Sequence, residues 1–276
     1  MSIGRLLKRK IAGEENLVDL IDQEVLKRKV YSFDDVVAAT KEFSKHSDED
    51  GFDRDKFMKA FYQLFQTMFS DPPRSTKSIH PSSFKEDCSR QLYYEFTDAE
   101  RTDSVTRKIN GQTQRIFDIG TWVHVYIQVI LWQAGVLEKS EVPVRSRKKR
   151  INGRGDGIIF FKGKRLLLEI KTINSFQVSK VKSKPLDHHE YQASIYASEL
   201  GMEEICYLYV NKDTFEIITH ILPVHASYVK LANEKIDDLN YSIEKKIAPT
   251  RICKDVNSHY AKTCPFKTLC FKKRGT

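Results

Sequence analysis

The feature that most constrains the fold of this chain is a pair of runs typical of β-strands, GDGIIFF at 155–161 and RLLLEIKT at 165–172. A short Lys-Gly-Lys turn centred on Gly163 separates them. Two such runs joined by a short turn that contains glycine predict a β-hairpin. The hairpin then decides which residues of the two strands face one another.

The predicted hairpin brings charged side chains together. With the turn centred on Gly163, Asp156 lies almost opposite Glu169, and directly opposed Cβ atoms are roughly 4.5–5.5 Å apart. Side chains alternate between faces along a strand, so Glu169 and Lys171 point the same way. Two carboxylates and a lysine on one patch can hold a hard divalent cation beside a positioned water. The alternative is a surface hairpin with an ordinary ion pair.

The composition is that of a globular protein. The chain has 276 residues, of which 40% are hydrophobic and 30% charged, so it can bury the core of one large domain or two smaller ones. No run approaches eighteen apolar residues, and no apolar segment follows the basic residues at the start. We therefore expect a cytoplasmic protein without a membrane partner.

The positive charge is unevenly distributed. The net charge is +9, but residues 1–75 carry a net charge of −1 and residues 76–276 a net charge of +10. Basic runs lie at 145–150, just before the hairpin, and at 272–274. Such an excess fits a polyanionic partner, most simply nucleic acid, and a solvated basic face is the alternative.

The chain is predicted to have two parts. Apolar residues at helical spacing and the paired prolines at 72–73 predict a helical accessory segment over 1–75 and a main domain over 76–276. The segment could bind a partner protein, cover a groove or complete the core. In the main domain we expect helices over 82–96, 117–135, 187–200 and 224–246, and strands over 141–147, 155–161, 165–172, 205–211 and 215–220. Strands clustered among helices predict an α/β fold with a central mixed sheet flanked by helices.

Two of the expected helices carry candidate site residues. His124 lies on an otherwise apolar helix, where a lone histidine is more often a core residue than a ligand. On the later helix His188, Gln192 and Tyr196 share a face, because positions four apart align. Gln and Tyr side chains can hydrogen-bond phosphates, and Tyr can also stack on a base, so this stripe is a candidate groove wall. A solvated stripe is the alternative.

The five cysteines fall into two groups. Cys206 lies in a strand-like context and is expected to be a buried small side chain. The other four could hold a [4Fe–4S] cluster or a structural zinc ion. These are Cys88, Cys253, Cys264 and Cys270. Structural zinc usually draws on close cysteine pairs, which are missing from this sequence, so the spacing favours iron–sulfur. Unrelated buried or free cysteines are the alternative.

Taken in order, these motifs resemble the RecB-like branch of the PD-(D/E)XK nucleases. The resemblance is closer to its iron–sulfur subgroup, which includes CRISPR-associated exonucleases and the nuclease domains of AddB-type helicase–nucleases. It spans roughly residues 80–272 and implies a restriction-endonuclease-like α/β core. The matching motifs are Cys88 with the residues after it, His124, Asp156, Glu169-Ile170-Lys171, Gln192-x-x-x-Tyr196 and the terminal cysteines.

The resemblance implies roles for the site residues. Asp156, Glu169 and Lys171 would be catalytic, with Lys171 orienting or helping to deprotonate the attacking water and stabilising charge on the phosphate. Gln192 and Tyr196 would position DNA. The ligands of Mg²⁺ or Mn²⁺ would be His124, Asp156, Glu169 and the Ile170 carbonyl. An imidazole ligand suits manganese in particular.

The resemblance also implies that Cys88, Cys253, Cys264 and Cys270 bind a [4Fe–4S] cluster, which staples the C-terminal segment to the helix after Cys88. One departure concerns Cys253. The family places its second and third cysteines two residues apart, whereas ten residues separate Cys253 from Cys264 here. A longer loop, a lost cluster or His259 as a substitute ligand are the possibilities.

The expected function is a metal-dependent DNA exonuclease that acts on DNA ends or single strands, in DNA recombination, repair or replication. A structure-specific endonuclease is the alternative within the same chemistry. A non-catalytic DNA-binding subunit on a nuclease fold is the alternative from another class.

Overall fold

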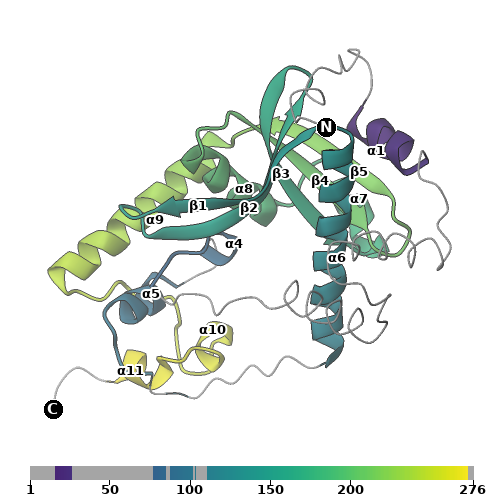
Figure 1. Ribbon diagram of the computed structural model, residues 1–276. Helices are drawn as coiled ribbons and strands as arrows, with labels where there is room; N and C mark the ends of the chain where they lie inside the picture. The colour runs from purple at the N-terminus through teal and green to yellow at the C-terminus, as the bar shows by residue number, and fades with distance from the viewer. Residues whose placement is uncertain (1–15, 27–76, 85–87, 102, 104–110, 273–276) are drawn as a thin grey trace, which may run out of the picture.

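The computed structural model contains a five-stranded mixed β-sheet flanked by helices (Figure 1). It describes residues 16–26, 77–84, 88–101, 103 and 111–272. The strands lie in the order β1-β2-β3-β4-β5; β3 and β4 are parallel, and the other neighbours are antiparallel. Their bounds are β1 Leu137–Ser146, β2 Ile151–Phe161, β3 Lys164–Ile173, β4 Glu204–Asn211 and β5 Ile217–Pro223. The predicted α/β class and central mixed sheet are confirmed.

The helices form a layer on each side of the sheet. In Figure 1, α6 crosses in front of the sheet while α8 and α9 lie behind it. None of the described helices combines the length and the hydropathy needed to cross a membrane. The helix bounds are α1 Leu17–Leu26, α4 Pro81–Phe84, α5 Ser89–Phe96, α6 Gly111–Gln133, α7 Val178–Val181, α8 Asp187–Glu199, α9 Ala226–Lys245, α10 His259–Lys262 and α11 Lys267–Phe271, with a 3₁₀ turn, η2, at Ser175–Gln177.

Strand β3 is buried on both faces and separates two hydrophobic cores. Leu168 and Ile170 pack in the core formed with α1 and α6, whereas Leu167 and Ile173 pack in the core formed with α8 and α9. A strand covered on both faces by helices carries apolar residues almost continuously, as the sequence RLLLEIKT does. Charged residues in the middle of such a strand therefore need a specific reason to be there.

The predicted hairpin is formed by β2 and β3. Phe161 pairs with Lys164, so Lys162 and Gly163 alone make the turn. Both turn residues have positive φ, 48° and 79°, as expected for a two-residue hairpin turn that follows the twist of its strands. The pairing runs back to Gly157 opposite Leu168, and the next residue of β2, Asp156, accepts a hydrogen bond from the Ile170 N–H of β3. The turn has two residues rather than the expected three, because Lys164 already belongs to β3.

The expected helix over 82–96 is wrong as a single element. The structure has α4 and α5 instead, and Cys88 precedes α5 in an extended conformation with φ −73° and ψ 117°. Extended backbone at Cys88 interrupts the i to i−4 hydrogen bonds that a continuous helix requires. Residues 85–87, between the two helices, lie outside the described residues.

The part of the accessory segment that the structure describes belongs to the core. Leu17, Leu20 and Ile21 of α1 are buried in the same hydrophobic cluster as Ile127 and Ile130 of α6. This packing favours the third of the roles considered for residues 1–75, completion of the core, at least for α1. The paired prolines at 72–73 and the boundary at 75 lie outside the described residues.

Candidate active site and cysteine pocket

Asp156 lies where β2, β3 and α6 meet. Its Oδ2 accepts a hydrogen bond of 2.6 Å from the Ile170 backbone N–H, and its Oδ1 lies 3.5 Å from His124 Nδ1. Burial alone raises the pKa of Asp156, but His124, Lys171 and the Ile170 N–H together hold it below its usual value. Burial conversely lowers the pKa of His124, and Asp156 outweighs that effect, so the pKa is raised. The two side chains therefore favour each other's charged form.

Glu169 is buried, with 1% of its surface exposed. Its Oε1 accepts hydrogen bonds from Lys171 Nζ at 2.7 Å and from Gln192 Nε2 at 2.9 Å. Its Oε2 is buried without a hydrogen-bond partner. Burial raises the pKa of Glu169 to about 7, although the charge of Lys171 opposes the rise. The second oxygen is thus a buried acceptor that no protein donor satisfies.

Lys171 brings a positive charge to these carboxylates. Burial alone lowers the pKa of Lys171, but Glu169 and Asp156 raise it above its usual value. Along β3, Glu169 and Lys171 alternate with Leu168 and Ile170, which point to the opposite face and pack in the core with α6. The strand therefore carries the charged pair on one face and stays apolar on the other. The structure therefore brings His124, Asp156, Glu169 and Lys171 together from α6, β2 and β3.

Helix α8 supports this group from inside the protein. Gln192 is buried and holds Glu169, while Tyr196 is 4% exposed. Burial raises the pKa of Tyr196 to about 12, although a hydrogen bond from the Arg154 backbone acts to lower it. His188, by contrast, is exposed and lies beside His189. The predicted polar stripe is therefore not a continuous groove wall, and Tyr196 presents no exposed ring face for a base.

Gln128 is a site residue that the sequence reasoning missed. It is buried on α6, one turn after His124, and its Nε2 donates 2.8 Å hydrogen bonds to the Asp156 carbonyl oxygen and to Glu141 Oε1. These bonds tie α6 to the strand that carries Asp156. The signal was present, because Gln128 is a second polar residue on the apolar helix at i+4 from His124.

The donor set of this site suits a hard divalent cation. It offers two carboxylates and an imidazole, and the unpaired Oε2 of Glu169 is the kind of buried oxygen that a cation satisfies. Across the described ranges, no three His, Cys, Asp or Glu side chains are arranged as they stand to hold a metal ion. Asp156 is instead paired with His124, and Glu169 with Lys171.

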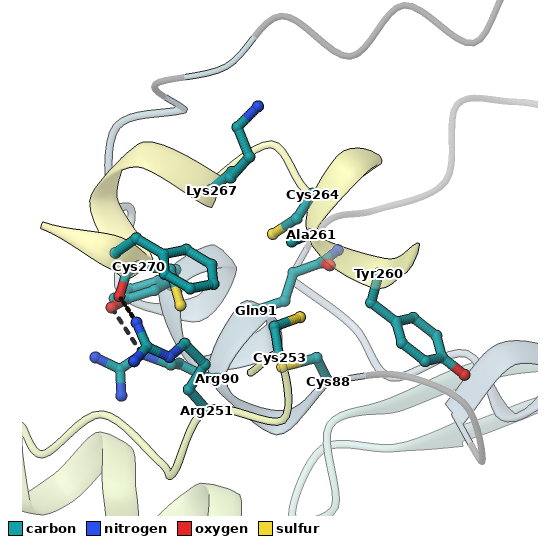
Figure 2. A pocket seen from close by; sticks show the side chains of 12 residues that line it. Cys88, Arg90, Gln91, Arg251, Cys253, Tyr260, Ala261, Cys264, Lys267 and Cys270 are labelled. Carbon is teal, nitrogen blue, oxygen red and sulfur yellow. Dashed lines mark hydrogen bonds between the residues drawn. The ribbon is translucent and has the colours of Figure 1, made fainter. Parts of the chain in front are cut away.

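Four cysteines line one pocket at the other end of the molecule. Figure 2 shows that Cys88 precedes α5, that Cys264 and Cys270 come from the segment around α10 and α11, and that Cys253 comes from the loop before it. The pocket has a volume of about 170 Å³. These are the four cysteines grouped in the sequence, and Cys206 is buried in β4, as predicted.

Burial, neighbouring thiols and two arginines set the pKa values of the pocket cysteines. Burial raises the pKa values of Cys264 and Cys270, and each thiolate also raises the pKa of the other. Arg90 and Arg251 act in the opposite direction on Cys270. His259 is not among the pocket-lining residues, although its neighbour Tyr260 is.

Long-range contacts bring the C-terminal segment back to α5. Phe266 is buried in the main core, where its ring lies 5.4 Å from that of Tyr94. Asp103 Oδ2 accepts a 2.8 Å hydrogen bond from the Thr268 N–H, and Arg90 Nη1 donates one of 2.8 Å to the Pro249 carbonyl. The cysteine pocket is therefore anchored to the main core by ordinary packing and hydrogen bonds.

Comparisons with known proteins give only distant similarities. No protein-family model and no curated protein matches this chain. Among solved structures, SSO0001 is similar with a TM-score of 0.43 and 20% identity, over 79% of this chain and 98% of that chain. The alkaline exonuclease LHK-Exo from Laribacter hongkongensis is similar with a TM-score of 0.47 and 13% identity, over 67% of this chain and 93% of that one. Its complex with dAMP gives a TM-score of 0.47 and 12% identity over the same shares.

Proposed function

We propose that this chain is a divalent-metal-dependent deoxyribonuclease of the RecB-like branch of the PD-(D/E)XK nucleases. It would act as an exonuclease on DNA ends or single strands, in DNA recombination, repair or replication. The observation that carries the proposal is the convergence of Asp156, Glu169 and Lys171 on one hairpin, with His124 of α6 beside them. The α/β sheet with helices on both faces agrees with the core that the sequence motifs imply.

The proposed metal ligands are His124, Asp156, Glu169 and the Ile170 carbonyl, for Mg²⁺ or Mn²⁺. When bound there, a divalent cation supplies Lewis-acid polarisation of the scissile phosphate and lowers the pKa of a nearby water. The unpaired Glu169 Oε2 supports this assignment, because a buried acceptor without a partner is unfavourable. The imidazole of His124 favours manganese relative to an all-oxygen site.

Lys171 contributes a fixed positive charge. Its raised pKa keeps the ammonium group protonated, which suits stabilisation of negative charge on the phosphate better than removal of a proton from water. Gln192 keeps the Glu169 carboxylate in place through its 2.9 Å hydrogen bond. In this scheme Gln192 and Tyr196 affect the DNA through the position of the catalytic side chains.

Cleavage of end-labelled DNA tests the proposal. Linear single- and double-stranded substrates and a circular single strand are incubated with Mg²⁺ or Mn²⁺. We expect loss of linear substrates from their ends, and a rate about 10²–10³-fold lower for Lys171→Ala, as for removal of a charge-stabilising group. The matched control is Lys162→Ala in the turn of the same hairpin, which should cleave like the unmodified chain.

Three results would change the assignment. Equal cleavage by Lys171→Ala and by the unmodified chain would refute the catalytic role of Lys171. Cutting of the circular strand would replace the exonuclease by an endonuclease that uses the same site. DNA binding without cleavage under all of these conditions would favour a non-catalytic DNA-binding subunit.

We also propose a [4Fe–4S] cluster bound by Cys88, Cys253, Cys264 and Cys270. Its support is that these four thiols line one pocket, although they come from segments far apart in the sequence. A structural zinc ion needs its four ligands about 2.0–2.3 Å from a single point. Structural zinc usually draws on close cysteine pairs, which these four do not form in the sequence, whereas a cluster spreads its thiolates over several iron atoms.

Iron content tests the cluster. After anaerobic purification we expect a coloured protein with iron and sulfide, which Cys88→Ala and Cys270→Ala should both lack. Cys206→Ala is the matched control, because Cys206 is buried in β4 away from the pocket and its loss should leave the iron content unchanged. A colourless, zinc-loaded protein would refute the cluster.

A further inference from the structure

Two phenylalanines stand exposed just beyond the candidate active site. Phe176 in η2 is 90% exposed, and Phe215 in the turn between β4 and β5 is 61% exposed. Phe176 follows Lys171 by five residues, so their Cα atoms are at most about 18 Å apart. Because β3 and β4 are parallel, η2 after β3 and the turn after β4 both lie at the end of the sheet toward which β3 runs.

Hydrogen bonds join the two loops that carry these rings. The Ser175 N–H donates to Asp213 Oδ2 at 2.8 Å, and the Lys212 N–H donates to the Ile173 carbonyl at 2.9 Å. Asn211 Nδ2 donates to Ser175 Oγ at 3.3 Å. The two loops are thus hydrogen-bonded to each other, which keeps Phe176 and Phe215 at the same edge of the sheet.

The backbone of Phe215 is unusual for an aromatic residue. Its φ is 60°, in the left-handed region that favours glycine and asparagine, and a bulky side chain there is strained. Its N–H is held by the Asn211 carbonyl at 2.7 Å. Phe215 is 61% exposed, so the protein buries only part of the side chain, and a ligand stacked on the ring would bury more of it.

The segment that carries Phe176 is basic. From Ile170 to Leu186 the chain has four lysines and no acidic residue. Lys180 and Lys182 are exposed on the segment that follows Phe176, whereas the turn of Phe215 carries Lys212 together with Asp213 and Glu216. Exposed aromatic rings next to lysines are the combination that binds single-stranded nucleic acid, since rings stack on bases while cations meet phosphates.

We propose that Phe176 and Phe215 form a stacking platform for the bases of a single DNA strand next to the active site. The identity of the strand rests on the proposed nuclease function, whereas the platform rests on the two rings and their bonded loops. Bases within a duplex offer no free faces, so the platform selects a strand that is already single. Stacking on aromatic rings tolerates any base, so we expect little sequence preference.

Binding of a fluorescent single-stranded oligodeoxynucleotide, measured by anisotropy, tests the platform. All variants are made in the full-length Lys171→Ala chain, which leaves the oligonucleotide intact. We expect Phe176→Ala and Phe215→Ala each to weaken binding roughly 5- to 150-fold, the range for loss of one stacked base. The matched control is Phe160→Ala, an exposed ring that pairs with Arg165 near the opposite end of β3 and should leave binding unchanged.

A second strand of equal length with abasic sites separates stacking from charge. The parent should bind it more weakly than the intact strand, and Phe176→Ala should bind both strands alike. Phe176→Tyr should restore the preference for the intact strand, because it keeps a ring at this position. Unchanged binding in both alanine variants, or an equal loss on intact and abasic strands, would overturn the platform.

The same measurements separate the platform from the proposed function. The chain with Lys171 intact could cleave no DNA while the variants still show base-dependent binding through these rings. That result would support the stacking platform and refute the proposed nuclease function. Cleavage that depends on Lys171, with binding indifferent to both rings, would keep the nuclease and refute the platform.

Discussion

Gly153 lies where β2 passes the ring of Tyr196, and alanine at this position is expected to destabilise the protein. A Cβ added at Gly153 would lie 2.6 Å from both Tyr196 Cε1 and its hydroxyl oxygen, and 2.9 Å from Cζ. Favourable contacts between carbon atoms are about 3.5–4.0 Å, so the ring would have to move by roughly 1 Å. Tyr196 is 4% exposed, so it cannot move into solvent.

The size of the effect follows from this overlap. Forcing an extra methyl group into a packed core lowers the free energy of unfolding by about 1–3 kcal/mol. At about 2–4 °C per kcal/mol for a domain of this size, Gly153→Ala should lower the melting temperature by roughly 2–12 °C. Gly120→Ala in α6 is the matched control, since its added Cβ would meet Thr172 Oγ1 at an ordinary 3.6 Å. Alanine also favours helix by about 1 kcal/mol, so this control should be as stable as the unmodified chain or more so.

Urea unfolding of a double-variant cycle tests the cause. In the Tyr196→Leu background the ring is gone, so Gly153→Ala should cost little more there. A coupling free energy of about 1–3 kcal/mol between the two positions is expected for residues in direct contact. An equal cost of Gly153→Ala in both backgrounds, or no cost in either, would refute the reasoning from the ring.

Two further predictions concern the amides that hold the carboxylates. Gln128→Leu should lower the free energy of unfolding by about 1–3 kcal/mol in urea titrations, because the buried Asp156 carbonyl loses its donor and Glu141 loses a bond. An unchanged unfolding midpoint would show that water replaces the amide. Gln192→Leu should weaken Mn²⁺ binding about 10–100-fold by calorimetry, because the amide orients the Glu169 carboxylate. Unaltered Mn²⁺ affinity in a folded variant would contradict that role.

The local part of the site was predictable from the sequence. Strand alternation and a turn centred on Gly163 set the approximate register, so a hairpin that brings Asp156 close to the Glu169-Ile170-Lys171 stretch followed from counting residues. The shared direction of Glu169 and Lys171 followed from the same alternation. Such features depend on residues close in the chain, where backbone geometry alone decides which side chains meet.

The remainder depends on contacts between distant segments. Whether Gln128 faces solvent or Asp156 depends on how α6 is rotated and placed on the sheet. The spacing of apolar residues along the helix does not specify that placement. Tyr196 was expected on a groove wall and is buried, because its ring packs against β2 at Gly153. The extended backbone at Cys88 likewise lies within a run whose side-chain pattern suits a helix.

The packing of Phe266 against Tyr94 has a consequence for the synthesis of the protein. The ring of Phe266 completes the main core, yet it is made 172 residues after Tyr94. At about 5–20 residues per second, a ribosome leaves the partner surface of Tyr94 uncovered for roughly 10–30 s. During that interval the nascent chain presents an apolar surface to chaperones and to neighbouring chains. This core therefore closes only after the segment that carries Phe266 has been made.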